Sequence, residues 1–172
     1  MKLFRANPGF TLLEVIIAVG LFVSAVSVII ALIAGLTRQG TDSNDALAAQ
    51  RLPEPLKVEL ARLALTGLDG LADRVPVMAM PLAGGLAFAA SRDSVRVDSL
   101  EFLAVADPIP ADEQYYLVEC WKFPTEPLRF DGQKAFLALY VRVSWPFRLP
   151  GAGAATAPAD RSQFTFTLSL NR

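Results

Sequence analysis

The chain has 172 residues, enough for one modest domain with its own core. Hydrophobic residues make up 53% of it, and its 16 Lys and Arg residues are balanced by 17 Asp and Glu residues, so no basic surface favours nucleic acid as a partner. It contains no histidine and a single cysteine, Cys120, which excludes an internal disulfide, a thiolate zinc site and the commonest general base. We therefore expect no enzyme, no cofactor and no metal site, with Cys120 as a small buried hydrophobe.

The N-terminal segment has the features of a membrane anchor. Residues 1–9 form a short leader that carries two positive charges, Lys2 and Arg5, and an uncharged stretch follows at 15–36. At ~1.5 Å per residue this stretch covers the ~30 Å hydrocarbon core of a bilayer. The apolar core of an ordinary secretory signal is only about 7–15 residues long. We expect the positive leader to stay in the cytoplasm, while Arg38 and the residues after it are exported.

A plain anchor does not explain Glu14. Placing a carboxylate in an apolar membrane helix costs ~2.5–3.5 kcal/mol, and such a residue usually has a partner, yet no cation lies nearby in this chain. If the chain were cut between Gly9 and Phe10, a new α-amino group would lie close to the same membrane depth. The amino group of a neighbouring subunit would then neutralise Glu14. The carboxylate therefore indicates a subunit that assembles with others.

The segment Gly9-Phe10-Thr11-Leu12-Leu13-Glu14-Val15 resembles the class III signal of type IV pilins and type II secretion pseudopilins. That signal is a short basic leader ending in Gly, then Phe-Thr-Leu-(Leu/Ile)-Glu, then an apolar helix. The resemblance implies that prepilin peptidase cleaves after Gly9 and N-methylates Phe10. It also implies that Glu14 guides the subunit into a filament of other pilin or pseudopilin subunits. The implied location is the bacterial inner membrane, with a cytoplasmic N-terminus and an exported C-terminal domain, and then a pilus or pseudopilus.

This resemblance covers about residues 1–40, and the chain departs from it in two places. Pro8 precedes the glycine where a basic residue is common, and no proline interrupts 10–36, where major pilins often have a kink. The second departure favours a minor pilin or a type II secretion pseudopilin over a major pilin.

The remaining chain predicts a helical extension and then a β-rich domain. We expect a transmembrane and assembly helix at 10–36, a soluble helical extension at 37–67 and a β-rich globular domain at 68–172. The polar residues 40–43 predict a break in the helix, after which Asp42, Ser43 or Asn44 caps a new one. Pro53 and Pro55 predict a further break near Pro53. A second helical piece should then run over 54–65 and end at Gly67 and Gly70.

Short apolar or alternating runs predict the strands of the β-rich domain. They cover 75–80, 86–90, 94–97, 100–106, 115–123, 135–145 and 163–170. A long N-terminal helix followed by such strands predicts an α+β fold, in which the helix packs on a C-terminal antiparallel sheet. This arrangement agrees with a pilin-like fold.

A calcium site is one alternative to a purely structural role. Asp107, Asp112 and Glu113 offer carboxylate oxygens, but their spacing does not match a calcium loop, so a solvated turn is favoured.

A binding function is the other alternative. The chain would then be a membrane-anchored binding protein or tip adhesin for DNA, a surface or secreted cargo. The loop at 150–159 or the two tryptophans, Trp121 and Trp145, would carry this function, although core packing is the usual role of a tryptophan on a strand.

Overall fold

The computed structural model describes residues 11–101, 107–149, 151 and 154–172. Its elements in chain order are α1 (Leu12–Ala49), α2 (Pro53–Leu63), the 3-10 helix η1 (Ala64–Thr66), α3 (Leu68–Arg74), β1 (Leu86–Ser91), β2 (Val97–Ser99), β3 (Gln114–Lys122), β4 (Phe136–Trp145), the 3-10 helix η2 (Pro158–Asp160) and β5 (Ser162–Asn171). The chain divides into two units, Met1–Ser43 and Asn44–Arg172. The first unit holds most of α1, and the second holds the end of α1 and all later elements.

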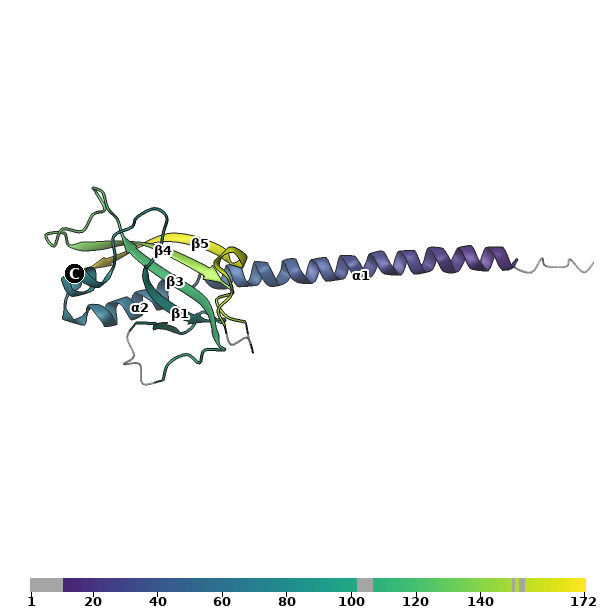
Figure 1. Cartoon of the computed structure of the whole chain (residues 1–172), viewed down its shortest axis with the longest axis horizontal. Coiled ribbons are helices and arrows are strands. Elements are labelled where there is room, and N and C mark those ends of the chain that lie inside the picture. Colours follow the sequence, from purple (N-terminus) through teal and green to yellow (C-terminus); the bar gives the residue numbers. More distant parts are fainter. Residues whose placement is uncertain (1–10, 102–106, 150, 152–153) are drawn as a thin grey trace, which may run out of the picture. The chain divides into compact units, whose positions relative to one another are not determined.

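The five strands form one antiparallel sheet in the order β2-β1-β3-β4-β5 (Figure 1). The longest ladder joins β4 to β5, from Phe136 opposite Asn171 to Trp145 opposite Ser162. Apolar and polar residues alternate along β5, which gives the strand one buried and one wet face. The α+β fold with a long N-terminal helix and an antiparallel sheet is thus confirmed.

Short helices and the sheet share one core within the Asn44–Arg172 unit. Leu52, the residue that caps the start of α2, and Leu56 and Leu60 within it recur every fourth residue, so they lie on one face, and all three are fully buried. Helix α2 contacts both edge strands, β2 and β5. The sheet contributes the buried residues Leu86, Phe88, Ala90, Val97, Tyr116, Val118, Cys120, Leu137, Leu139, Val141, Val143, Trp145, Leu168 and Leu170.

The helix break predicted at 40–43 was wrong, because α1 continues through these residues to Ala49. None of the three predicted caps, Asp42, Ser43 and Asn44, begins a helix. A single Gly inside a helix costs only about 1 kcal/mol, and the Thr41 hydroxyl donates to the carbonyl of Thr37 at 3.1 Å instead of competing for the helix backbone.

The interruption near Pro53 lies between Ala49 and Pro53. Pro53 occupies the first turn of α2, where its missing N–H would have no helical partner in any case. Gly67, with φ of 110°, closes η1 in a conformation that favours glycine. Gly70 does not end a helix as predicted, because α3 runs through it to Arg74.

Two of the predicted strands differ in the structure. The segment 75–80 forms a single parallel bridge, Val77 to Lys122, because Pro76 and Pro81 remove the backbone donors that a ladder needs. The run 94–97 contributes only its last residue to a strand, β2, since Ser94 lies in a turn with φ of 61°. The strand predicted at 100–106 lies largely outside the described residues.

Candidate functional site

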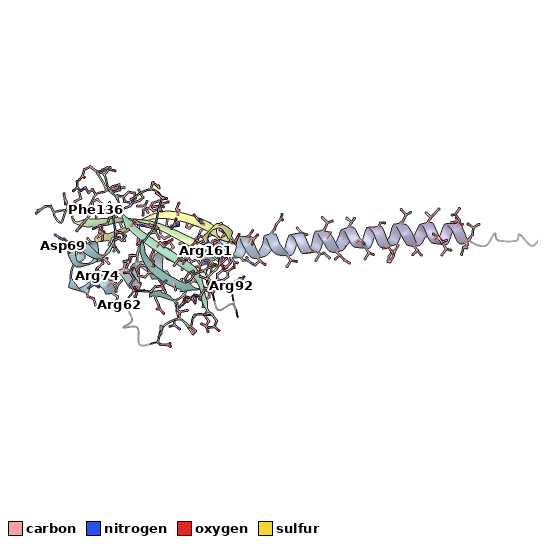
Figure 2. All side chains as sticks on the ribbon, viewed as in Figure 1. Arg62, Asp69, Arg74, Arg92, Phe136 and Arg161 are labelled. Carbon is pink, nitrogen blue, oxygen red and sulfur yellow. The ribbon has the colours of Figure 1, made fainter. Side chains whose placement is uncertain are left out.

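The apolar part of α1 exposes its side chains on all sides (Figure 2). From Leu12 to Leu36 every side chain is exposed except that of Val26, which is half-buried. A helix of a water-soluble domain normally has one apolar stripe and one polar face, whereas this segment is apolar around its whole circumference. Within Leu12–Leu63 the described chain has one helical stretch that is long and apolar enough to cross a membrane.

The few hydroxyl groups in this segment are paired inside the helix. Ser24 Oγ donates to the Gly20 carbonyl and Ser27 Oγ to the Val23 carbonyl, both at 2.9 Å. Both bonds reach back four residues, so the hydroxyls present no unpaired donor to an apolar environment. Glu14 is the one charged residue between Leu12 and Leu36.

Glu14 forms a reciprocal cap with Thr11 at the start of α1. The Thr11 N–H donates to Glu14 Oε2 at 3.4 Å, and the Glu14 N–H donates to Thr11 Oγ1 at 3.3 Å. This is the capping-box arrangement of Thr and Glu three residues apart, and the helix dipole also favours an acid at this end. The structure thus gives Glu14 a local hydrogen-bond partner, Thr11, which the sequence analysis did not predict.

The cap does not neutralise the charge of Glu14. Both bonds are longer than the 2.7–3.2 Å usual for N–H···O bonds, so each is weak. Among the described residues no cation forms an ion pair with this carboxylate. The predicted cleavage and methylation residues, Gly9 and Phe10, lie outside the described residues.

A buried carboxylate ties the last turns of α1 to the sheet within the Asn44–Arg172 unit. We call Asp45, Arg92, Ser94, Tyr115 and Tyr116 the Asp45 cluster. Asp45 is 6% exposed and accepts hydrogen bonds from Tyr115 Oη at 2.6 Å and from Arg92 Nη2 at 3.2 Å. Tyr116 Oη donates to the Asp45 carbonyl at 2.9 Å, and Ser94 Oγ donates to the Ala48 carbonyl at 2.8 Å.

The electrostatics of the Asp45 cluster favour the neutral form of both tyrosines. Burial, and then the hydrogen bond and charge of Asp45, raise the pKa of Tyr115 above that of a free phenol. Burial and the Asp45 charge raise the pKa of Tyr116 to about 12. The Arg92 guanidinium lies 4.7 Å from the centre of the Tyr115 ring and supplies the compensating positive charge. The cluster is therefore a structural anchor for the end of α1.

The two tryptophans and the cysteine serve packing. Trp121 is 1% exposed and donates from Nε1 to the Ala83 carbonyl at 3.2 Å, while Trp145 packs against Tyr116 with ring centroids 5.9 Å apart. Cys120 is fully buried, and burial raises the pKa of its thiol. Neither tryptophan offers a ring surface for a sugar or a partner.

The calcium alternative receives no support from this arrangement. The Asp107 carboxylate lies 3.7 Å from Arg96 Nη2, which also hydrogen bonds to the Asp107 carbonyl. Asp112 and Glu113 instead line a surface hollow with Arg92. Among the residues that the structure describes, no three acidic, histidine or cysteine side chains come together as a metal site.

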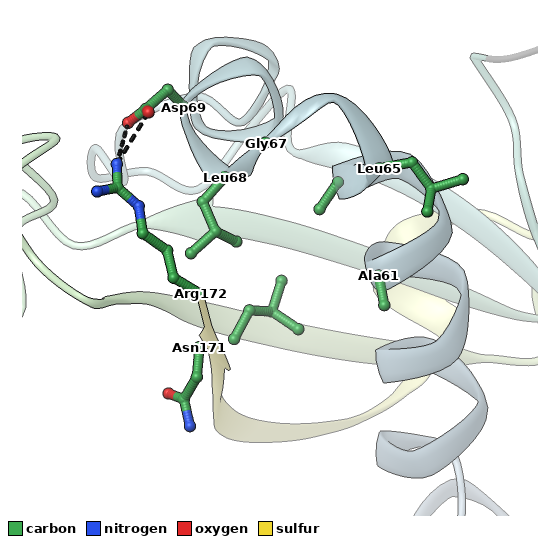
Figure 3. A pocket seen from close by; sticks show the side chains of 9 residues that line it. Ala61, Leu65, Gly67, Leu68, Asp69, Asn171 and Arg172 are labelled. Atoms are coloured by element: carbon green, nitrogen blue, oxygen red, sulfur yellow. Dashed lines mark hydrogen bonds and ion pairs between the residues drawn. The ribbon is translucent and has the colours of Figure 1, made fainter.

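A mainly apolar pocket of about 430 Å³ lies where β5 ends (Figure 3). Figure 3 shows it between the end of β5 and the helical turn that bears Leu65, with Leu68 pointing into it. Arg172 Nη2 pairs with Asp69 Oδ2 at 2.9 Å on its rim. The lining residues are Ala61, Ala64, Leu65, Gly67, Leu68, Asp69, Leu170, Asn171 and Arg172.

Sequence reasoning missed the Asp45 cluster and this pocket. Asp45 and Tyr115 are 70 positions apart in the chain, and neither lies in a motif that would link them. The one available signal was an acid within an otherwise apolar helical pattern, which is equally common on a solvated helix face. The pocket depends on where α2 stops relative to β5, and no local pattern specifies that.

The loop predicted as a binding element at 150–159 lies partly outside the described residues. Its described part is tied down by Arg161, whose Nε donates to the Thr156 carbonyl at 2.9 Å. In comparisons with known proteins, no family model matches the chain, and no curated protein or solved structure shows significant similarity to it.

Proposed function

We propose that this chain is a structural subunit of a type IV pilin-like filament, either a minor pilin or a type II secretion pseudopilin. In this proposal the apolar part of α1 first holds the chain in the bacterial inner membrane. It later packs against the helices of other subunits inside the filament, with the sheet domain exported.

The observation that carries the proposal is the combination of an all-round apolar helix with one carboxylate in its first turn. Membrane anchoring alone accounts for the exposed apolar side chains from Leu12 to Leu36. It gives no reason for Glu14, whose charge is left without a cation in the described chain and is costly in lipid. A neighbouring subunit that presents an α-amino group would remove that cost.

The proposed processing follows from the same carboxylate. Prepilin peptidase would cleave after Gly9 and methylate the new amino group of Phe10. The capping box would survive this cut, because both of its residues, Thr11 and Glu14, lie on the retained side. The partners are then prepilin peptidase, other pilin or pseudopilin subunits and the membrane itself.

The intact mass of the protein purified from membranes tests this proposal. Expression with an active prepilin peptidase should give the mass of residues 10–172 plus one methyl group, and expression without it should give the full chain. A matched control carries Gly9→Leu, which should keep the full-length mass even with the peptidase present. A full-length mass of the natural sequence under both conditions would leave a simple signal anchor and would contradict the filament proposal.

A further inference from the structure

The two edges of the sheet differ in how they are protected. Strand β2 is three residues long and carries Asp98, with Arg96 just before it. Short edges and charged side chains are the usual means by which proteins prevent another chain from adding to a sheet. Strand β5 is ten residues long, and its sequence Ser-Gln-Phe-Thr-Phe-Thr-Leu-Ser-Leu-Asn contains no charge, no proline and no glycine. The edge at β5 therefore lacks these protections.

The register shows which backbone groups of β5 point away from β4. The Arg172 N–H donates to the Ala135 carbonyl at 2.9 Å, and Phe136 lies opposite Asn171 in the ladder. Hydrogen-bonded and non-hydrogen-bonded pairs alternate in an antiparallel ladder. The residues of β5 whose N–H and C=O groups point away from β4 are consequently Gln163, Thr165, Thr167, Ser169 and Asn171.

The apolar pocket adjoins this free edge. Leu170 and Asn171 line it from β5 and Arg172 from the residue after β5, while Leu65 lines it from η1 and is 84% exposed. Residues opposite one another in a sheet point to the same face, so a partner residue opposite Leu170 would point toward the pocket. The rim carries a self-neutralising ion pair, Asp69 with Arg172, so the pocket favours an uncharged side chain.

We propose that the free edge of β5 and the adjoining pocket bind an extended, uncharged segment of another protein, which adds to the sheet as a sixth strand. The N–H and C=O groups that point away from β4, for which the described residues offer no partner, provide affinity for any extended backbone, and the pocket selects an apolar side chain at one position. The absence of charge from Ser162 to Asn171 matches an uncharged partner strand with apolar residues at every second position. This inference is independent of the filament proposal, because it involves only the Asn44–Arg172 unit.

Selection from a library of random ten-residue phage-displayed peptides tests the inference. The full chain is held in lipid nanodiscs, and empty nanodiscs remove background binders. We expect the enriched peptides to alternate apolar and polar residues, with few charges and no central proline. The absence of enrichment over empty nanodiscs, or an enriched motif that is charged or proline-rich, would overturn the inference.

Variants of the edge test the backbone contacts of the best enriched peptide. Thr167→Pro removes an N–H that points away from β4, a position where an edge strand tolerates proline, and should weaken binding about tenfold or more. The control Thr167→Ala keeps the N–H and should bind like the natural protein. Should Thr167→Pro not fold, N-methylation of alternate peptide residues removes the same hydrogen bonds from the other side. Unchanged binding of the N-methylated peptides would contradict strand addition.

Variants of the pocket test the side-chain contact. Leu65→Lys places a charge at the pocket and should weaken binding about tenfold. Val58→Lys is the matched control, since Val58 is 73% exposed in the neighbouring α2 and does not line the pocket. Equal binding by the two variants would remove the pocket from the site.

Sedimentation of the full chain tests whether a second copy of the chain occupies the edge. Self-association that Thr167→Pro abolishes would make a second copy the occupant and contradict the inference.

Discussion

The apolar segment of α1 and the Asn44–Arg172 unit use similar amino acids in opposite ways. From Leu12 to Leu36 large apolar side chains are exposed, Phe22 among them at 69%. In the Asn44–Arg172 unit equivalent residues such as Leu139 are fully buried. The second region buries its apolar residues in a core of its own, whereas the apolar side chains of the first are exposed. This difference fits a helix that is long and apolar enough to cross a membrane.

The sharpest test of this comparison is a matched pair of leucine substitutions. Leu139→Ala should lower the free energy of unfolding by about 3 kcal/mol, because it leaves a cavity in the core. Leu32→Ala, in the exposed segment, should change it by less than about 0.5 kcal/mol. Urea unfolding of the full chain in detergent micelles, followed by tryptophan fluorescence, measures only the sheet region, since Trp121 and Trp145 both lie on strands. An equal loss in both variants would mean that the apolar segment belongs to the same folding unit.

A pair of aspartate substitutions tests where the independent fold begins. Asp45→Ala should cost about 2 kcal/mol, because it removes the buried acceptor of Tyr115 and Arg92. Asp42→Ala, less than one turn earlier and exposed, should cost less than about 0.5 kcal/mol. The same urea measurement separates them. If the two variants were equally stable, the Asp45 cluster would not anchor the end of α1.

Alkaline pH should weaken the same anchor. The pKa of Tyr116 is raised to about 12 in the folded protein, against about 10 in an unfolded chain. As the pH rises, the Tyr116 phenol therefore loses its proton in the unfolded chain before it does so in the folded protein. The contribution of Tyr116 to the free energy of unfolding is fully present below about pH 10 and is lost as the pH rises toward 12. Urea midpoints across this range should decline, and Tyr116→Phe should decline less steeply. A Tyr116→Phe profile as steep as that of the natural protein would assign the loss to other groups.

The elements of this molecule that sequence alone could predict are those set by local periodicity. The runs at 115–123, 135–145 and 163–170 alternate strongly and became β3, β4 and β5. The predictions at 40–43 and 75–80 were wrong for different reasons. At 40–43 a long helix absorbed its glycine, and at 75–80 two prolines prevented a ladder.

The candidate site likewise contains one feature that the sequence predicts and others that depend on the fold. Glu14 was visible in the sequence because a charge inside an apolar stretch contrasts with its neighbours. The Asp45 cluster joins α1 to residues in β3 and in the turn after β1, so only the three-dimensional arrangement brings it together. The free edge of β5 likewise depends on strand order, which the alternation within a strand does not encode.

The last pair of substitutions lies in the first turn of α1. Its expected effect on helix stability is the smallest, yet it is the most informative about α1. Glu14 has two candidate roles: a cap for Thr11 and a charge for another subunit. Thr11→Ala removes half of the capping box, at a cost of about 1 kcal/mol, and keeps the charge. Glu14→Gln keeps a capping acceptor, since glutamine serves equally in a capping box, and removes the charge.

The two substitutions therefore separate the roles when incorporation into filaments is compared with the amount of subunit in the membrane. If Glu14 meets the amino group of another subunit, Glu14→Gln should insert normally and fail to incorporate, as should Glu14→Ala. Thr11→Ala should then incorporate almost as well as the natural sequence. The reverse pattern, with Glu14→Gln incorporated and Thr11→Ala excluded, would make Glu14 a helix cap only. Its presence in the apolar helix would then follow from the local chemistry of the helix terminus, and the assembly role would be wrong.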